Sequence, residues 1–225
     1  MTELSLTNVG TEQKSLELTF ASANLPSPTV SARLDLPAGA QRRLDGVVAW
    51  LRTKVSGIGG GPFLGPLFVT VPSGTVEGIV VLGRTLNPAP GGGRYGLAYP
   101  GIPYGASSTG TLFIGGLRQN TTNRSNVAFV NTAERGETPI VLKVELFDAS
   151  TGAKAGEFEK TLAPRELSQE NQLLRRWPGL EAAWLRVTRV SGENTFLAYG
   201  VVNDGAEPGQ GSGDGSFYQG EVPLP

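Results

Sequence analysis

The sequence contains no cysteine and no histidine. Without cysteine the chain can form no disulfide framework and no zinc–thiolate site, and it has no thiol nucleophile. Without histidine it lacks the commonest general base near neutral pH and the commonest metal ligand. These two absences exclude Ser-His-Asp catalysis and histidine-bound zinc.

Charge is sparse and nearly balanced. Lysine and arginine number 19, aspartate and glutamate number 20, and charged residues make up 17% of the chain. Because no basic field is present to hold a phosphate backbone, we expect no nucleic-acid partner. A membrane-spanning helix requires about 18 consecutive apolar residues, and none is written here, so we expect no transmembrane segment.

The N-terminus carries no visible signal peptide. Met1, Thr2 and Glu3 lead almost directly into Leu4-Ser5-Leu6, which already alternates like a strand. A native N-terminus seldom begins inside an element, so we expect this sequence to be a piece of a longer, exported chain with Met1 added.

Glycine and proline are abundant, at 32 and 16 residues, while hydrophobic residues make up 39%. Short alternating runs such as Leu16–Phe20 and Leu142–Leu146 are separated by turn signals every ~8–12 residues, which is typical of an antiparallel β-sandwich. A parallel sheet would need crossover helices of at least about 10–12 residues, and none is apparent. The pattern therefore predicts an all-β chain.

The same order of features occurs twice, with a period of about 120 residues. A strand ending in asparagine occurs at Leu4–Asn8 and again at Val127–Asn131. In each half an alternating strand follows, then a strand ending at a corner, then a short segment of helical spacing. The helical segments contain Leu44, Val47, Val48 and Leu51 in one half and Leu173, Leu174 and Trp177 in the other. We therefore expect two tandem β-sandwich domains, each with one short helical segment at a corner.

Each half then contains what reads as a β-hairpin. The clearer one is Trp184–Asn203, where Leu185 and Val187 alternate with polar residues before the turn Ser191–Asn194. A looser copy joins Leu67–Val71 to Ile79–Leu86.

One strand, Thr111–Leu117, has no counterpart in the first half. It either begins the second domain, which leaves the first domain without its first strand, or it completes the first domain. We place the domains at residues 1–105 and 106–225. An unpaired edge strand invites pairing, so we expect a neighbouring segment, a strand swap or a homodimer to cover it.

The arrangement resembles immunoglobulin-like repeat modules of large secreted bacterial surface proteins. The resemblance rests on the strand-asparagine motif, the hairpin, and the corners Leu36-Pro37-Ala38-Gly39-Ala40-Gln41 and Leu162-Ala163-Pro164-Arg165-Glu166-Leu167. It implies export to the cell surface or the extracellular medium, and an adhesive or structural role. It supplies no catalytic residues.

Aromatic residues gather near the end of each half and are the candidate binding residues. They are Tyr95, Tyr99 and Tyr104 in the first half, and Phe217 and Tyr218 in the second. Aromatic rings on loops at the end of a sandwich stack on sugar rings or anchor a protein partner. The alternative is that they cap the core or bury the junction between the two domains. Trp184 becomes an interface candidate if its face of the strand is open to solvent.

Asp204, Glu207 and Asp214 lie in a glycine-rich loop and form a candidate Ca²⁺ site, since calcium prefers oxygen ligands on flexible loops. The alternative is that they are solvated loop charges. We expect no other cofactor.

Three functions are compatible with the sequence. The favoured one is a non-enzymatic spacer, adhesion or interaction module whose protein or glycan partner is unknown. The second is a carbohydrate-binding module that uses the loop aromatics, with or without Ca²⁺. The third is an enzyme that uses carboxylates alone, for which Glu166 and Glu170 are the nearest pair.

Overall fold

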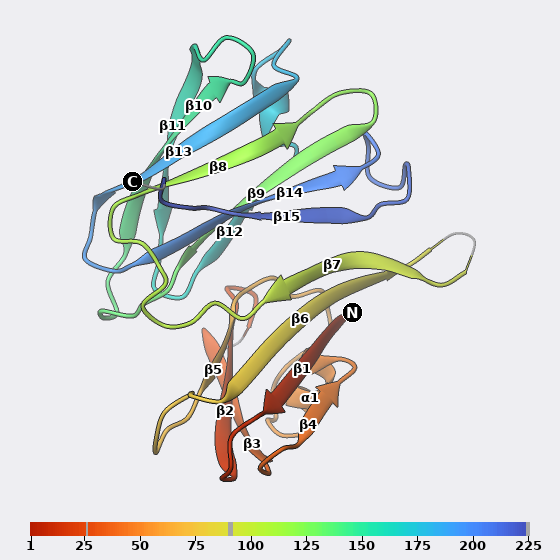
Figure 1. Cartoon of the computed structure of the whole chain (residues 1–225), viewed down its shortest axis with the longest axis vertical. Coiled ribbons are helices and arrows are strands. Elements are labelled where there is room, and N and C mark those ends of the chain that lie inside the picture. Colours follow the sequence, from red (N-terminus) through yellow and green to blue (C-terminus); the bar gives the residue numbers. More distant parts are fainter. Residues whose placement is uncertain (26, 90–91, 224–225) are drawn as a thin grey trace. The chain divides into compact units, whose positions relative to one another are not determined.

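The computed structural model describes residues 1–25, 27–89 and 92–223, and its regular structure is almost entirely β-strand (Figure 1). The chain divides into two compact units, Met1–Gly101 and Ile102–Pro225. Each unit is an antiparallel sandwich of two sheets, as the alternating pattern predicts. The division predicted after residue 105 lies in the segment between this boundary and the first strand of the second unit.

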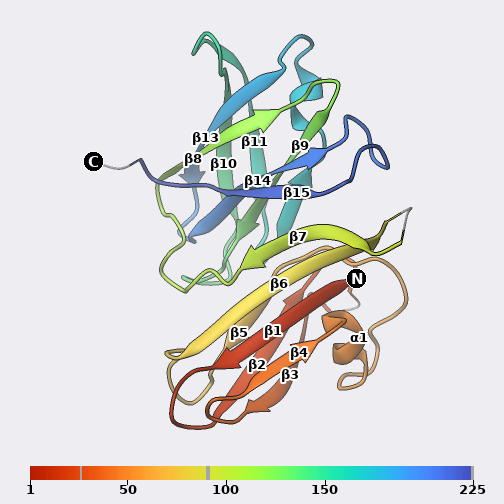
Figure 2. The ribbon, with the colours of Figure 1, turned by 45° about the vertical axis from the view of Figure 1, so that its right-hand side comes forward.

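The first unit contains seven strands and one helix among the described residues. They are β1 (Thr2–Asn8), β2 (Lys14–Ala21), β3 (Thr29–Leu36), β4 (Gln41–Leu44), α1 (Val47–Arg52), β5 (Leu67–Thr70), β6 (Ile79–Pro88) and β7 (Arg94–Pro100). One sheet has the order β4-β1-β6-β7 and the other the order β3-β2-β5 (Figure 2).

The second unit contains eight strands and one 3-10 helix among the described residues. They are β8 (Thr111–Arg118), β9 (Asn123–Asn131), β10 (Ile140–Asp148), β11 (Lys154–Leu162), β12 (Leu167–Glu170), η1 (Leu173–Arg176), β13 (Ala182–Ser191), β14 (Phe196–Asp204) and β15 (Gly215–Gln219). Its sheets have the orders β12-β9-β14-β15 and β11-β10-β13-β8.

The two units share one strand order. Replacing β9 to β15 by β1 to β7 converts the sheet β12-β9-β14-β15 into β4-β1-β6-β7, and converts β11-β10-β13 into β3-β2-β5. Strand β8 is the additional element of the second unit. Each residue of one unit can therefore be compared with a residue at the same place in the other.

Alternation along the strands explains why these residues fold as sandwiches. In β2, Leu16 and Leu18 are fully buried while Glu17 between them is not, which is the two-residue period of a strand with one face on the core. The buried side chains form a core in each unit, and the core of the second unit includes Leu142, Val144 and Leu146 of β10.

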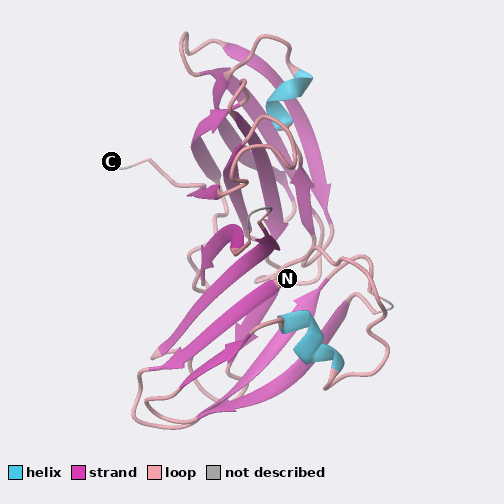
Figure 3. Ribbon diagram, turned by 90° about the vertical axis from the view of Figure 1, so that its right-hand side faces the viewer, coloured by secondary structure: helices cyan, strands magenta, loops and turns pink. Residues whose placement is uncertain are grey.

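A helical segment forms in each predicted place, but both are shorter than the spacing predicts, since Leu44 ends strand β4 and Trp177 follows η1 (Figure 3). In α1 the buried side chains are Val47 and Leu51, four residues apart on one face. In the second unit the segment is a single 3-10 turn whose buried residues are Leu173 and Leu174.

Neither predicted hairpin forms. Strands β13 and β14 lie in different sheets, and so do β5 and β6. The turn residue Asn194 explains the difference in the second unit, because its side chain does not close a turn between the two strands. Instead its amide donates to the carbonyls of Gly136 and Thr138, at 2.7 Å each, in the loop between β9 and β10.

The strand predicted over Thr111–Leu117 forms as β8 and belongs to the second unit, where it pairs with β13. Just before β8, Ser108 pairs with Phe196 of β14, in the opposite sheet. The segment therefore crosses from one sheet to the other. No helix in the described residues has the length and apolar character that a membrane crossing requires.

Candidate functional sites

Four of the five candidate aromatic residues lie in strands and not in end loops. Tyr95 and Tyr99 belong to β7, and Phe217 and Tyr218 belong to β15. These strands occupy the same position in the two units, each at the end of its sheet. The aromatics are thus side chains of edge strands, which the sequence did not reveal because glycine-rich turns adjoin them.

Tyr99 and Tyr218 are equivalent residues. Tyr99 lies directly opposite Gly83 of β6, and Tyr218 lies directly opposite Gly200 of β14. Burial raises the pKa of the Tyr99 hydroxyl, although a hydrogen bond with the Thr85 side chain acts in the other direction. Tyr218 lies against Gly116 of β8, where an added Cβ would be 3.1 Å from the ring. Both rings are therefore placed beside a glycine.

Phe217 contacts the ring of Tyr199 on β14, with centroids 5.1 Å apart and an interplanar angle of 41°. Both side chains are half-buried. A pair of this kind on neighbouring strands stabilises the sheet.

Tyr104 belongs to the second unit and is 61% exposed. Partial burial, followed by the nearby charge of Glu134, raises its pKa. The same carboxylate accepts a hydrogen bond of 2.6 Å from the Ser107 hydroxyl. Of the candidate aromatics, Tyr104 is therefore the one that presents most of its surface to solvent.

The three candidate calcium ligands lie around one loop, and the side chains of Asp204 and Glu207 bond to other residues of the chain. The Asp204 carboxylate accepts hydrogen bonds from the backbone and the hydroxyl of Ser212, at 2.8 and 2.7 Å, and these bonds lower its pKa. Glu207 forms an ion pair with Arg175 that lowers the pKa of the carboxylate. The backbone carbonyl of Asp214 accepts a hydrogen bond from the Asp204 amide at 2.9 Å.

A guanidinium group holds the carbonyls of this loop. Arg124 donates to the carbonyl oxygens of Gly205, Glu207 and Asp204, at 2.7, 3.1 and 3.4 Å. A cation site would need such oxygens for its own coordination shell. Across the described residues, no three acidic side chains come together in a way that could hold a metal ion.

The outer face of the sheet β11-β10-β13-β8 carries a row of rings. Trp184 of β13 stacks on Phe147 of β10, with centroids 4.0 Å apart and an interplanar angle of 6°. Phe113 of β8 lies on the other side of Trp184, at 6.1 Å. All three side chains are half-buried. Trp184 can be singled out from the sequence, but Phe113 and Phe147 cannot, because only the register of three strands brings the three rings together.

A buried carboxylate borders this row. Glu145 is 6% exposed and accepts hydrogen bonds from Arg186 at 2.6 Å and from Lys154 at 2.9 Å. These bonds, that of Arg186 first, lower the pKa of the carboxyl to about 2. The Arg186 guanidinium also lies over the Phe147 ring, 5.3 Å from its centroid, so that the ionic and aromatic groups of the face are joined.

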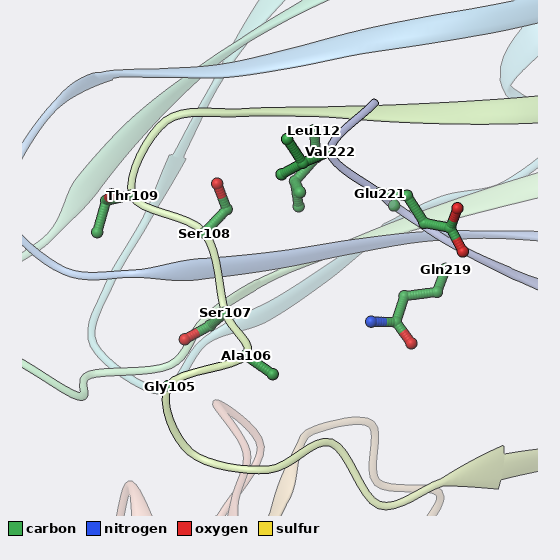
Figure 4. A pocket seen from close by; sticks show the side chains of 10 residues that line it. Gly105, Ala106, Ser107, Ser108, Thr109, Leu112, Gln219, Glu221 and Val222 are labelled. Atoms are coloured by element: carbon green, nitrogen blue, oxygen red, sulfur yellow. The ribbon is translucent and has the colours of Figure 1, made fainter. Parts of the chain in front are cut away.

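A shallow hollow of about 620 Å³ lies where β8 begins and β15 ends (Figure 4). Ser107, Ser108 and Thr109 lie on one of its sides, and Gln219 and Glu221 on the other. Among the described residues that line the hollow, Glu221 carries the one carboxylate, and the Glu134 carboxylate bonds to Ser107 at its edge.

The acids considered as a catalytic pair have other partners. Glu170 forms ion pairs with Lys160, at 2.7 Å, and with Arg176. The Glu166 carboxylate accepts a hydrogen bond of 2.7 Å from the Ala163 backbone and so closes the corner after β11.

No family model, no curated protein and no solved structure matches this chain. Its function has to be inferred from its own geometry.

Proposed function

We propose that this chain is a non-enzymatic module with a structural or interaction role in an exported bacterial protein, at the cell surface or outside the cell. One observation carries the proposal: the same strand order is built twice, and the polar group that recurs with it in the described residues, the strand-ending asparagine, bonds to the backbone of its own unit. The two units share buried leucines, strand-ending asparagines and edge-strand tyrosines. Residues shared in this way serve folding and surfaces, and no catalytic group is among them. We interpret the shared order as a tandem repeat.

The distribution of charge supports the same proposal. The most buried acids of the second unit, Glu145 and Glu170, each form two ion pairs with basic neighbours. These basic neighbours lower the pKa values of both carboxyl groups, so both stay ionised near neutral pH and neither can donate a proton as a general acid.

The test is a hydrolase screen of the purified full chain against ester, glycoside, phosphate and peptide substrates. We expect no turnover above the buffer rate. Turnover that disappears in Glu221→Gln, the carboxylate of the hollow, and persists in Glu159→Gln, an exposed acid of β11, would overturn the proposal.

A carbohydrate-binding module is the second candidate, and the row of Phe113, Trp184 and Phe147 favours it, because sugar rings stack on aromatic faces. A glycan array tests it. Binding that is lost in Trp184→Ala and kept in Tyr104→Ala would support this candidate. Absence of signal across neutral and acidic glycans, with and without Ca²⁺, would remove this candidate.

A further inference from the structure

Strand β5 of the first unit has an open edge. In the second unit the equivalent strand, β13, is paired on both sides, with β10 and with β8. In the described residues, β5 pairs with β2 alone and ends its sheet. An edge of this kind presents backbone N–H and C=O groups that a further strand can bind.

The core beside this edge is open as well. Gly200 of β14 lies under β8, and an added Cβ there would be 2.7 Å from Cδ2 of Leu117 and 3.1 Å from Cγ2 of Ile114. At the equivalent Gly83 of β6, the nearest atoms would be 3.9 Å away, and both belong to Tyr99. A Cβ at Gly83 would therefore make only ordinary van der Waals contacts among the described residues, whereas one at Gly200 would clash with side chains of β8. We call the less crowded space over Gly83 the groove.

The side chains of β5 are also less buried than those of the equivalent strand β13. Leu185 and Val187 of β13 are fully buried. Leu67 and Val69 of β5 occupy the same places, as their pairing with β2 establishes, but they are only half-buried. The first unit thus exposes apolar side chains along β5 that its counterpart covers with β8.

Strand β8 of the second unit shows which side chains can occupy such a groove. Leu112 of β8 lies opposite Val187 and Ile114 lies opposite Leu185, so large aliphatic side chains alternate on the buried face. Gly116, which has a positive φ of 74°, then leaves room for the ring of Tyr218. Tyr99 is the equivalent ring in the first unit, so the same sequence of aliphatic residues followed by glycine is complementary to the groove.

We propose that the β5 edge and the groove over Gly83 accept an extended polypeptide segment from outside this chain. The segment runs antiparallel to β5, with aliphatic side chains at alternate positions followed by glycine. Main-chain hydrogen bonds to β5 supply affinity, and the alternate side chains that enter the groove supply selectivity. The inference rests on the proposed interaction role and names the chemistry of the partner.

The experiment adds a synthetic peptide with the sequence of residues 109–120 to the full chain and follows backbone amides by NMR. We expect resonances of Leu67–Thr70, Gly83 and Tyr99 to shift saturably, and exchange of the β5 amides with solvent to slow. A control peptide with aspartate at the positions of Leu112 and Ile114 is expected not to bind. The substrate screen above does not depend on this result, so the two proposals can fail separately.

Two variants test the groove itself. Gly83→Leu fills it, and we expect at least a tenfold loss of peptide affinity with the fold retained, because an added Cβ makes only ordinary van der Waals contact with Tyr99 and Gly83 does not have a positive φ. Ala98→Leu, on the exposed side of β7, is the matched control and is expected to leave affinity unchanged.

Three results would overturn the proposal. The first is no shift of the β5 resonances at about 1 mM peptide. The second is a shift confined to β13, which would mean that the peptide displaces β8. The third is a concentration-dependent dimer that Gly83→Leu abolishes and that excludes the peptide, which would assign the edge to a second copy of this chain.

Discussion

Two buried asparagines perform the same task at the same place in each unit. The Asn8 side-chain amide donates to the carbonyl of Leu36 at 3.1 Å, and that of Asn131 donates to the carbonyl of Leu162 at 3.2 Å. Each bond joins the end of a strand in one sheet to the end of a strand in the other. The repeated motif of a strand ending in asparagine could be predicted from the sequence, but its role as a link between sheets depends on distant partners.

We expect Asn131→Ala to lower the free energy of unfolding of the second unit by about 3 kcal/mol. The substitution leaves the Ala133 N–H and the Leu162 carbonyl without their side-chain partner, and each unsatisfied buried group costs about 1–3 kcal/mol. Urea titration followed by circular dichroism measures the change. Asn171→Ala removes an exposed asparagine and should have little effect, so equal losses in both variants would contradict this role.

At Glu145 we expect a stability loss in acid. In the folded protein the pKa of Glu145 is about 2, below its ordinary value of 4.5. The ionised carboxylate therefore stabilises the fold in full above pH 4.5, neutral pH included. This contribution is lost as pH falls from 4.5 to 2. Thermal melts across that range should show a shallower decline in Glu145→Gln than in the wild type. Glu159→Gln, an exposed acid, should retain the steeper decline, and identical slopes in all three proteins would refute the assignment.

At the scale of elements, alternation predicts strands well and predicts their partners poorly. Leu185 and Val187 are buried as their spacing indicates, but β13 and β14 lie in different sheets. The residues Ser191–Asn194 are compatible with a hairpin turn and with a crossing between sheets, since both need glycine and short polar side chains. What decides between them is that Asn194 bonds to the loop between β9 and β10, and no local pattern contains that information.

The candidate sites, too, can be predicted from the sequence only in part. Edge-strand tyrosines could be singled out from composition, but their positions beside Gly83 and Gly200 follow from strand register. The row of Phe113, Trp184 and Phe147 comes from three strands that are distant in sequence. The sequence therefore identifies the aromatic residues, but the pairing of the strands determines which aromatic side chains are in contact.

The two equivalent glycines should respond differently to substitution. Gly200→Val forces atoms into Leu117 and Ile114 and should lower stability by about 1–3 kcal/mol, as overpacked cores do. At Gly83 an added Cβ makes only ordinary van der Waals contact with Tyr99, so Gly83→Val should change stability by less than about 1 kcal/mol. Denaturant titrations of both variants measure the difference. Equal destabilisation would mean that the groove over Gly83 is closed in solution.

On the scale of the whole molecule, the described residues form separate hydrophobic clusters in the two units. Leu16 and Leu142 are fully buried at equivalent positions of β2 and β10. We expect two calorimetric transitions, with Leu16→Ala lowering one and Leu142→Ala lowering the other, each by about 2–5 kcal/mol. A single transition that both variants lower equally would show that the chain unfolds as one cooperative body.

The path of the segment that enters the second unit has a mechanical consequence. Ser108 bonds to Phe196 in one layer, and from Thr111 onward the same segment bonds to β13 in the other. Tension that arrives along this segment is therefore shared by both layers, and neither layer can peel away alone. In an optical trap, a bound strand along β5 should raise the force at which the first unit ruptures.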